Sequence, residues 1–364
     1  MDELTLLRSA RTDPPKPSRQ ALDSGRAALL AHIEESRRPA SRPSVARRMP
    51  VLRRVGYSAA CTAVAATLVT GLIMSDMVGL AGWRGGADPA AAAVLNEASA
   101  LTIATADPVL KPGQYLRVDT SAVYNGLGPA GKNGREIFFL TITEDQLYIP
   151  ANLNDDWVWM RGMRKPYQAF GPESEAAMQS EWEQSLAKRG SPDYQENVRA
   201  AGGAFYGSPS SDVEMLAALP RDPYQLLNNI YRITLGQGPS PDGEALVWIS
   251  DTLRGGGIPA DLRGALYEAA AMIPGVMITE GVATLNGRTG IAIGRQESGQ
   301  KTRLDMIIDP ETGEMIGERT TVVALGGDYP LPVGAIVGWT AVTTTVVDEA
   351  PAGGNVYGHM GLPG

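Results

Sequence analysis

Carboxylates are the side chains best suited to chemistry in the last third of this chain. Residues 304–323 read LDMIIDPETGEMIGERTTVV, and four carboxylates fall within ten residues of this stretch, namely Asp305, Asp309, Glu311 and Glu314. Two carboxylates held close together can act as a general acid and a general base. The spacing therefore raises the question whether this stretch is an acid–base site or ordinary architecture.

The residues between these carboxylates favour a hairpin turn. Asp309 can bond the turn backbone, Pro310 fixes its own φ, and Gly313 can supply a left-handed residue. Before the turn, apolar residues alternate with Asp305 as they do along a half-buried strand. We therefore interpret the stretch as two strands joined by a turn, and we predict no catalytic residue in it.

Histidine and cysteine, the usual bases, nucleophiles and zinc ligands, are scarce. The chain contains His32, His359 and Cys61, all near its ends. Between them, Ser–His–Asp and Cys–His catalysis lack a base, and a nitrogen- or sulfur-rich zinc site lacks ligands. We predict no catalytic residue, no cofactor and no metal. A hydrolase that uses serine with lysine or two carboxylates stays open, because it needs no local motif.

One glycine-rich stretch matches a nucleotide-binding pattern by its letters. Residues 126–131 read GLGPAG, which fits G-x-G-x-x-G. The strand expected over residues 136–142 follows it, so no helix N-terminus is present to receive a pyrophosphate. We interpret this stretch as a hairpin loop.

Three tryptophans on predicted strands are the candidates for ligand binding. Trp157, Trp159 and Trp339 could line a groove on a sheet and contact an apolar ligand. They could equally fill the core between the sheet and the helices that pack on it. The sequence leaves both roles open.

Charge divides the chain into two parts. Residues 1–54 hold twelve Arg or Lys against six Asp or Glu, whereas residues 55–364 hold 20 against 34. The overall content of 43% hydrophobic and 20% charged residues describes a globular protein with a core. Such asymmetry between segments indicates a boundary.

The boundary is a predicted transmembrane helix over residues 55–74. These twenty residues carry no charge, and as a helix they would be about 30 Å long, which is roughly the thickness of the bilayer core. Four arginines stand just before this segment, namely Arg47, Arg48, Arg53 and Arg54. The positive-inside rule then predicts a single-pass cell-membrane protein with residues 1–54 in the cytoplasm and the C-terminal part outside.

The predicted span also carries small residues at four-residue spacing, namely Ala59, Ala63, Thr67 and Gly71. Such a stripe lets two helices approach closely, which would make the chain a homodimer. A segment this rich in alanine and threonine also shows such a stripe by chance. Both readings remain open.

The cytoplasmic segment is short, with helical character over residues 2–11 and 18–35. Residues 37–50 are rich in Arg, Pro and Ser, which is typical of a flexible tether close to anionic membrane lipid. Topology and lipid contact account for the arginines, and the segment lacks a nucleic-acid-binding module. We expect no nucleic acid partner, and the second helix is long enough to dock a protein.

Beyond the span we predict a juxtamembrane linker (75–93), an extracytoplasmic α+β domain (94–348) with a polar insertion (173–212), and a flexible tail (349–364). Strands are expected over 114–124, 136–149 and 156–162, and helices over 94–104, 173–188, 222–233, 244–253 and 259–272. Asn286-Gly287 and two further turns predict a C-terminal β-meander. The fold class is α+β, a curved antiparallel sheet packed against helices.

Three stretches resemble a widespread actinobacterial family of single-pass membrane proteins: LPRDPYQLL (219–227), IPADLRGALYEAAAMIPGV (258–276) and IIDPETGEMIGER (307–319). The resemblance covers most of residues 94–348. Members are often encoded beside extracytoplasmic-function sigma factors, which implies such a factor as a partner. The family implies no activity. The meander also resembles the unclosed barrel of lipoprotein-carrier and sigma-factor-regulating sensor domains, which hold acyl chains in a cleft between sheet and helices.

Two functions of different classes follow as expectations. The first is a non-enzymatic envelope sensor that regulates a cytoplasmic sigma factor through residues 1–54. The second is a membrane-tethered lipid or lipoprotein carrier with an apolar ligand between sheet and helices. A histidine-independent hydrolase is a third.

Overall fold

The computed structural model describes residues 85–105, 107–128, 137–205, 213–326 and 331–356. The predicted cytoplasmic segment (1–54) and membrane span (55–74), with the topology arginines and the small-residue stripe, lie outside these residues. Within the described residues, no helix is both long enough and sufficiently apolar to cross a bilayer.

Helices and strands alternate irregularly along the described chain. The helices are α5 (Pro89–Ala104), α6 (Pro172–Arg189), α7 (Val213–Ala218), α8 (Pro223–Ile233), α9 (Pro241–Leu253) and α10 (Ala260–Ala271). The first five strands are β1 (Tyr115–Gly128), β2 (Ile137–Pro150), β3 (Asp156–Gly162), β4 (Lys165–Ala169) and β5 (Gln195–Ala201). The remaining strands are β6 (Val276–Leu285), β7 (Arg288–Arg295), β8 (Thr302–Ile308), β9 (Met315–Val322), β10 (Ile336–Val347) and β11 (Asn355–Val356).

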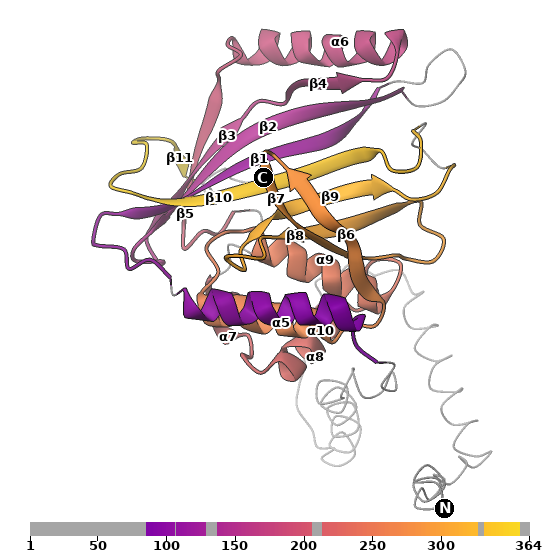
Figure 1. Cartoon of the computed structure of the whole chain (residues 1–364). Coiled ribbons are helices and arrows are strands. Elements are labelled where there is room, and N and C mark those ends of the chain that lie inside the picture. Colours follow the sequence, from indigo (N-terminus) through magenta and orange to yellow (C-terminus); the bar gives the residue numbers. More distant parts are fainter. Residues whose placement is uncertain (1–84, 106, 129–136, 206–212, 327–330, 357–364) are drawn as a thin grey trace, which may run out of the picture. The chain divides into compact units, whose positions relative to one another are not determined.

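These strands form one sheet in the order β11-β5-β3-β2-β1-β10-β9-β8-β7-β6 (Figure 1). Strand β4 pairs with the first half of β2, and β3 pairs with the second half. The pairs are antiparallel except for the parallel pair of β11 and β5. The described residues thus show the expected α+β class with an antiparallel-dominated sheet.

Helices α5, α8, α9 and α10 pack on the β6–β9 part of the sheet and lie together on one side of it in Figure 1. Their apolar residues form the largest core cluster with strand residues such as Ile293, Met306 and Ile308, all of which are 1% exposed or less. Burial of apolar side chains at about 25 cal/mol per Å² is the main force that holds the two layers together.

Helix α5 begins earlier than the sequence analysis placed it. Asp88 stands before Pro89 and accepts a hydrogen bond from the backbone N–H of Ala90 at 3.0 Å, the same cap signal that starts α8 at Asp222-Pro223. Ala91 is fully buried. The last residues of the predicted linker (75–93) therefore belong to the folded domain.

The two faces of the sheet can be assigned from the strand register. Residues paired across an antiparallel ladder share a face, and successive residues alternate between faces. Val118 lies on the helix face, because a Cβ on Gly256, just after α9, would come within 2.7 Å of it. Asp119, Ser121 and Val123 of β1 therefore lie on the opposite face.

The opposite face carries two further apolar clusters. One joins Val123 and Phe138 to residues of β9 and β10. The other joins Leu285 of β6 to Ile316 and Ala341. Trp339 packs against both clusters, so apolar side chains of the protein itself fill much of this face.

Two segments differ from the sequence analysis. The predicted polar insertion (173–212) contains not only the surface helix α6 but also β5, which pairs with both β3 and β11 inside the sheet. The predicted flexible tail (349–364) begins with an anchored stretch. The Arg199 guanidinium donates to the carbonyl of Pro351 at 2.5 Å, and Asn197 donates to that of Ala352 at 3.1 Å. Residues 357–364 lie outside the described residues.

Candidate binding cleft

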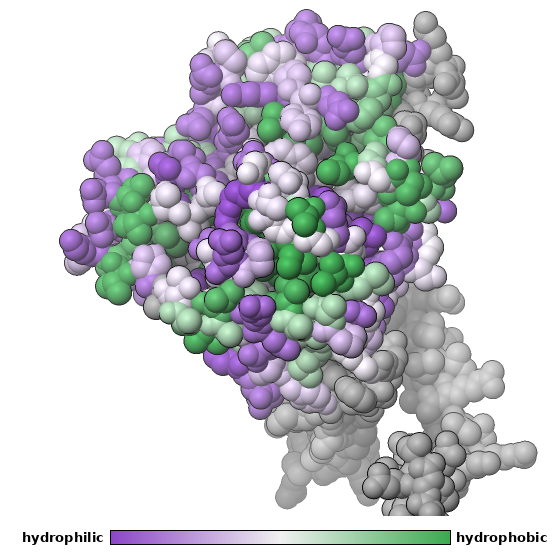
Figure 2. Space-filling view, in the orientation of Figure 1, coloured by the Kyte–Doolittle hydropathy of each residue, from purple (hydrophilic) through white to green (hydrophobic). Residues whose placement is uncertain are grey.

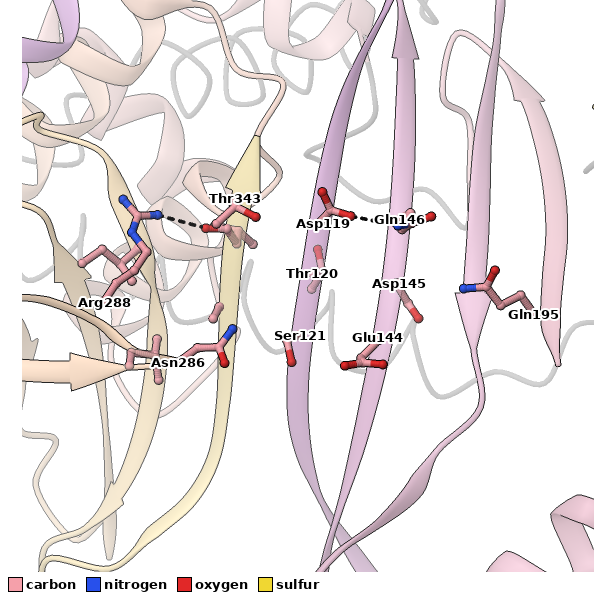
Figure 3. Close-up of a pocket in the computed structure, with 14 residues that line it drawn as sticks. Asp119, Thr120, Ser121, Glu144, Asp145, Gln146, Gln195, Asn286, Arg288 and Thr343 are labelled. Carbon is pink, nitrogen blue, oxygen red and sulfur yellow. Dashed lines mark hydrogen bonds between the residues drawn. The ribbon is translucent and has the colours of Figure 1, made fainter. Parts of the chain in front are cut away.

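A cleft of about 320 Å³ opens on the face of the sheet opposite the helices (Figure 3). Its floor comes from neighbouring strands β10, β1 and β2, and one wall comes from the β6–β7 hairpin. Side chains that alternation places on this face are Asp119, Ser121, Glu144, Gln146, Gln195 and Thr343, together with Leu285, Asn286, Arg288, Ile316 and Ala341 from the hairpin side. We call this site the cleft.

The β6–β7 hairpin is held in place over the cleft by its turn and by its flanking residues. Asn286 and Gly287 adopt φ of 47° and 78°, as a two-residue hairpin turn requires. The Leu285 side chain is 4% exposed and packs with Ile316. The Arg288 guanidinium donates to the carbonyl of Val342 at 3.4 Å. Leu285 and Arg288 therefore fix the end of the hairpin to β9 and β10, while the turn residues Asn286 and Gly287 are exposed.

Arg288 also contacts the acidic turn singled out in the sequence. Its guanidinium lies 3.5 Å from Asp309 and 3.6 Å from Glu314. This turn is a hairpin as predicted: Asp309 accepts the backbone N–H of Glu311 at 2.9 Å, and Gly313 has φ of 73°. The two carboxylates therefore position a residue of the cleft wall.

The fourth carboxylate of that stretch, Asp305, is fully buried on the face of the sheet opposite the helices, which is the same face as the cleft. Arg303 binds it through two nitrogens at 2.6 and 3.1 Å. Arg319 lies between Asp305 and Glu280. The charges of two arginines and two carboxylates balance, and their ion pairs link β6, β8 and β9.

Part of the cleft floor is rigid because its polar groups bond one another. Asp119 pairs with Arg117 at 2.8 Å and accepts a hydrogen bond from Gln146 at 3.0 Å. The Tyr148 hydroxyl donates to the side-chain amide oxygen Oε1 of Gln146 at 3.0 Å. Both oxygens of Asp119 are thus occupied, and Arg117 offsets its charge.

Other cleft side chains have no hydrogen-bond partner among the described residues. These are Ser121, Glu144, Gln195, Asn286 and Thr343. They come from β1, β2, β5 and β10 and from the β6–β7 turn, and all line the cleft (Figure 3). Ser121 and Glu144 are direct neighbours across the β1–β2 ladder. A hydroxyl, a carboxylate and amides can each donate or accept hydrogen bonds.

The cleft chemistry suits a polar ligand that is neutral or positively charged. Glu144 has no ion-pair partner among the described residues, whereas Arg288 already contacts two carboxylates. Leu285, Ile316 and Ala341 add an apolar strip along one wall. Few convergent polar groups beside an apolar strip are typical of small-ligand sites. An acyl chain would leave the polar groups of this cleft unpaired.

The three tryptophan candidates do not form one groove. Trp159 pairs with Leu147 and Trp339 pairs with Val123. By alternation Trp157 and Trp159 lie on the helix face and Trp339 on the opposite face. Trp157 is 2% exposed, and its indole N–H donates to the Leu153 carbonyl at 3.0 Å, so it fills a core. The ring of Trp339 meets that of Tyr167 edge-on at 6.3 Å.

A buried cluster of polar residues on the helix face contains a serine beside a carboxylate. Ser250 of α9 donates to Glu318 of β9 at 2.6 Å, and Arg254 lies 3.4 Å from the same carboxylate. Burial raises the pKa of Glu318, and Arg254 partly opposes that rise. Ser250 has no exposed surface, so no substrate reaches its hydroxyl. The contact ties helix α9 to the sheet.

Sequence reasoning missed the cleft. The sequence predicts a strand over residues 114–124 and a turn at Asn286-Gly287. Nothing in the sequence placed residues 286 and 119 together, because β6 and β1 are separated in the sheet by β7 to β10. Only the bend of the sheet brings the hairpin tip over β10 and β1.

No family model matches the chain, and no curated protein matches it either. Among solved structures, it is similar to the MucA/MucB complex of Pseudomonas aeruginosa, with 8% identity and a TM-score of 0.26 over 72% of this chain and 59% of that chain. It is also similar to a DUF1329 family protein from Desulfovibrio piger, with 8% identity and a TM-score of 0.17 over 70% of this chain and 91% of that chain. The chain thus spans less than two thirds of the first of these. At such TM-scores neither likeness carries an argument about function, and the actinobacterial resemblance stays an expectation.

Proposed function

We propose that this chain is a single-pass, non-enzymatic membrane sensor. Its outer domain binds a polar ligand in the cleft, and residues 1–54 report the binding to a cytoplasmic regulator. The cleft carries the proposal: polar side chains from four strands and a fixed hairpin meet around one opening and have no partner among the described residues. The uncharged run of residues 55–74 behind a basic segment supports the membrane anchor.

Strand β6 supplies a physical link between the cleft and the start of the domain. It ends at Leu285 in the cleft wall, and it begins at Val276, whose carbonyl accepts the backbone N–H of Asp88 at 2.7 Å. Asp88 is the N-cap of α5, the first described helix after the predicted span. A ligand that contacts both the hairpin and β1 would favour one position of β6 relative to the sheet. That bias would reach the chain where it leaves the membrane.

The polar lining favours this sensor over a lipid carrier at the cleft. Among the cleft side chains, carboxylates, amides and hydroxyls outnumber the apolar wall residues. The actinobacterial resemblance supports an extracytoplasmic-function sigma factor as the regulator.

Native mass spectrometry of the full chain, purified from the cells that produce it, tests the cleft. Thr343→Trp should fill the cleft and abolish binding of a co-purified polar ligand. Thr345→Trp is the matched control, because Thr345 lies on the same strand and face, outside the cleft lining. Equal ligand occupancy in wild type and both variants, or a wild type free of ligand, would contradict the proposal.

Co-purification tests the cytoplasmic half. We expect a sigma factor or another transcription regulator to co-purify with the tagged full chain and not with a chain that lacks residues 2–36. Recovery of no such regulator, or equal recovery with the shortened chain, would count against the reporting role of residues 1–54.

A further inference from the structure

A second cavity, of about 260 Å³, lies where β3, α6 and β5 meet. Four cationic side chains line it, namely Arg161, Arg164, Lys188 and Arg189. Its residues come from the end of β3, the β3–β4 turn, the second half of α6 and the start of β5. We call it the basic pocket.

Each of the three arginines of the basic pocket contacts an aromatic ring. Arg161 lies 4.9 Å from the ring centre of Trp159, Arg164 lies 5.3 Å from that of Tyr124, and Arg189 lies 4.9 Å from that of Tyr194. A guanidinium stacked on a ring keeps its N–H groups directed outward in its own plane. The fork geometry that binds oxyanions is therefore largely set before any ligand arrives.

Carboxylates compensate this charge only in part. Glu196 pairs with Arg161 at 3.2 Å, and Glu181 also lines the pocket. No carboxylate among the described residues lies within ion-pair distance of Arg164 or Lys188. The lining therefore carries two more cations than carboxylates.

This excess stands out against the rest of the domain. The described residues contain 17 Arg or Lys and 30 Asp or Glu. Cations in the last turn of a helix complement its dipole, which accounts for Lys188 and Arg189. It does not account for Arg161 and Arg164, which come from β3 and the turn after it.

We propose that the basic pocket binds a phosphate group. Planar, pre-positioned guanidinium groups with a nearby ammonium are the donors that phosphate oxygens prefer. The site is separate from the cleft: Gln195 lines the cleft, whereas the next residue, Glu196, lines the basic pocket. Successive strand residues point to opposite faces. The phosphate belongs to a free anion or to a phospholipid headgroup, both of which the chemistry accommodates.

Calorimetric titration of the full chain in an uncharged detergent tests the phosphate site. One arm uses inorganic phosphate, a second uses dihexanoyl phosphatidylglycerol, and sodium chloride at equal ionic strength is the blank. The test variant is Arg164→Ala with Lys188→Ala. The control variant is Lys165→Ala with Lys301→Ala, which removes the same charge from residues outside the pocket lining.

We expect saturable binding of at least one phosphate probe by the wild type, a loss of affinity of tenfold or more in the test variant, and unchanged affinity in the control. Binding of inorganic phosphate assigns the site to a free anion, and binding of the short-chain lipid alone assigns it to a headgroup. Absence of saturable binding to either probe, or an equal loss in the control, overturns the proposal. Arg164, Lys188 and Lys301 are exposed and Lys165 is half-buried, so we expect both variants to remain folded, and thermal unfolding of each variant checks this.

Discussion

Buried polar groups of the domain differ in whether the protein satisfies them, and this decides what each contributes. Asp242 is 3% exposed and accepts the Tyr231 hydroxyl at 2.9 Å. Tyr267 is fully buried, and its hydroxyl has no hydrogen-bond partner in the part of the chain that the structure describes. Glu318 lies between these cases, because Ser250 and Arg254 contact it while burial disfavours its charge.

Glu318 gives a pH prediction with a definite sign. Its folded-state pKa is raised above the ordinary value of 4.5, chiefly by burial. Its contribution to stability is therefore fully present below that ordinary value and is lost as pH rises through the raised pKa. The free energy of unfolding of wild type minus that of Glu318→Gln should fall between pH 4 and pH 8. Urea unfolding at each pH measures this difference, and a difference that grows with pH would contradict the assignment.

The two tyrosines make a matched pair. An unsatisfied buried hydroxyl costs about 1–3 kcal/mol, whereas a satisfied one stabilises. Tyr267→Phe should leave the free energy of unfolding unchanged or raise it by about 1 kcal/mol. Tyr231→Phe should lower it by about 1–3 kcal/mol, because Asp242 loses a donor. Denaturant unfolding at pH 7 distinguishes them, and equal destabilisation by both variants would show that the Tyr267 hydroxyl is bonded in solution.

At the scale of elements, hairpin turns do more than reverse the chain. The β8–β9 turn approaches α5, where the Thr102 hydroxyl donates to the Gly313 carbonyl at 3.2 Å. The β6–β7 turn forms the wall of the cleft. The β7–β8 turn, at Gly299, has open space around it. These three turns each contain a glycine at positive φ, yet their contacts in the folded domain differ.

Gly313 and Gly299 separate backbone strain from packing. Both have φ between 70° and 80°, so an alanine at either position costs about 1–2 kcal/mol in backbone strain. A Cβ at Gly313 would also come within 2.6 Å of the Ala98 carbonyl oxygen of α5. A Cβ at Gly299 would have no other atom within 4 Å. Gly313→Ala should therefore destabilise by about 1–3 kcal/mol more than Gly299→Ala. Equal losses on thermal unfolding would mean that α5 does not hold this position.

The sequence predicted local structure well and long-range placement poorly. Asn286-Gly287 and Asp222-Pro223 gave a turn and a helix start, because their chemistry acts on the adjacent backbone. Asp88-Pro89 carries the same helix-start signal, but it stands in an alanine-rich stretch that has the composition of a linker. The pairing of β5 with β3 and β11 could not be read from residues 173–212, because their polar composition hides a strand. The cleft depends on the bend of the whole sheet, which no local pattern encodes.

At the scale of the whole molecule, the described domain presents two polar cavities of different charge. The lining of the cleft contains three carboxylates and one arginine, whereas that of the basic pocket contains four cations and two carboxylates. Figure 2 shows apolar and polar side chains interspersed on the face in view. Under the proposed topology, both cavities would lie outside the membrane, on a domain tied to it by residues 75–84. Their ligands would then be molecules of the cell envelope. The proposed sensor function therefore depends on the described domain lying outside the membrane and residues 1–54 lying inside.

Labelling of cysteines in intact cells tests that position most directly. In a Cys61→Ala background, Ser298→Cys places a thiol on the exposed β7–β8 turn, and Ser24→Cys places one in the predicted cytoplasmic segment. A membrane-impermeant maleimide should label the first variant in intact cells and the second only after the cells are permeabilised. Labelling of Ser24→Cys in intact cells, with Ser298→Cys protected until permeabilisation, would contradict the proposed topology and the sensor function with it.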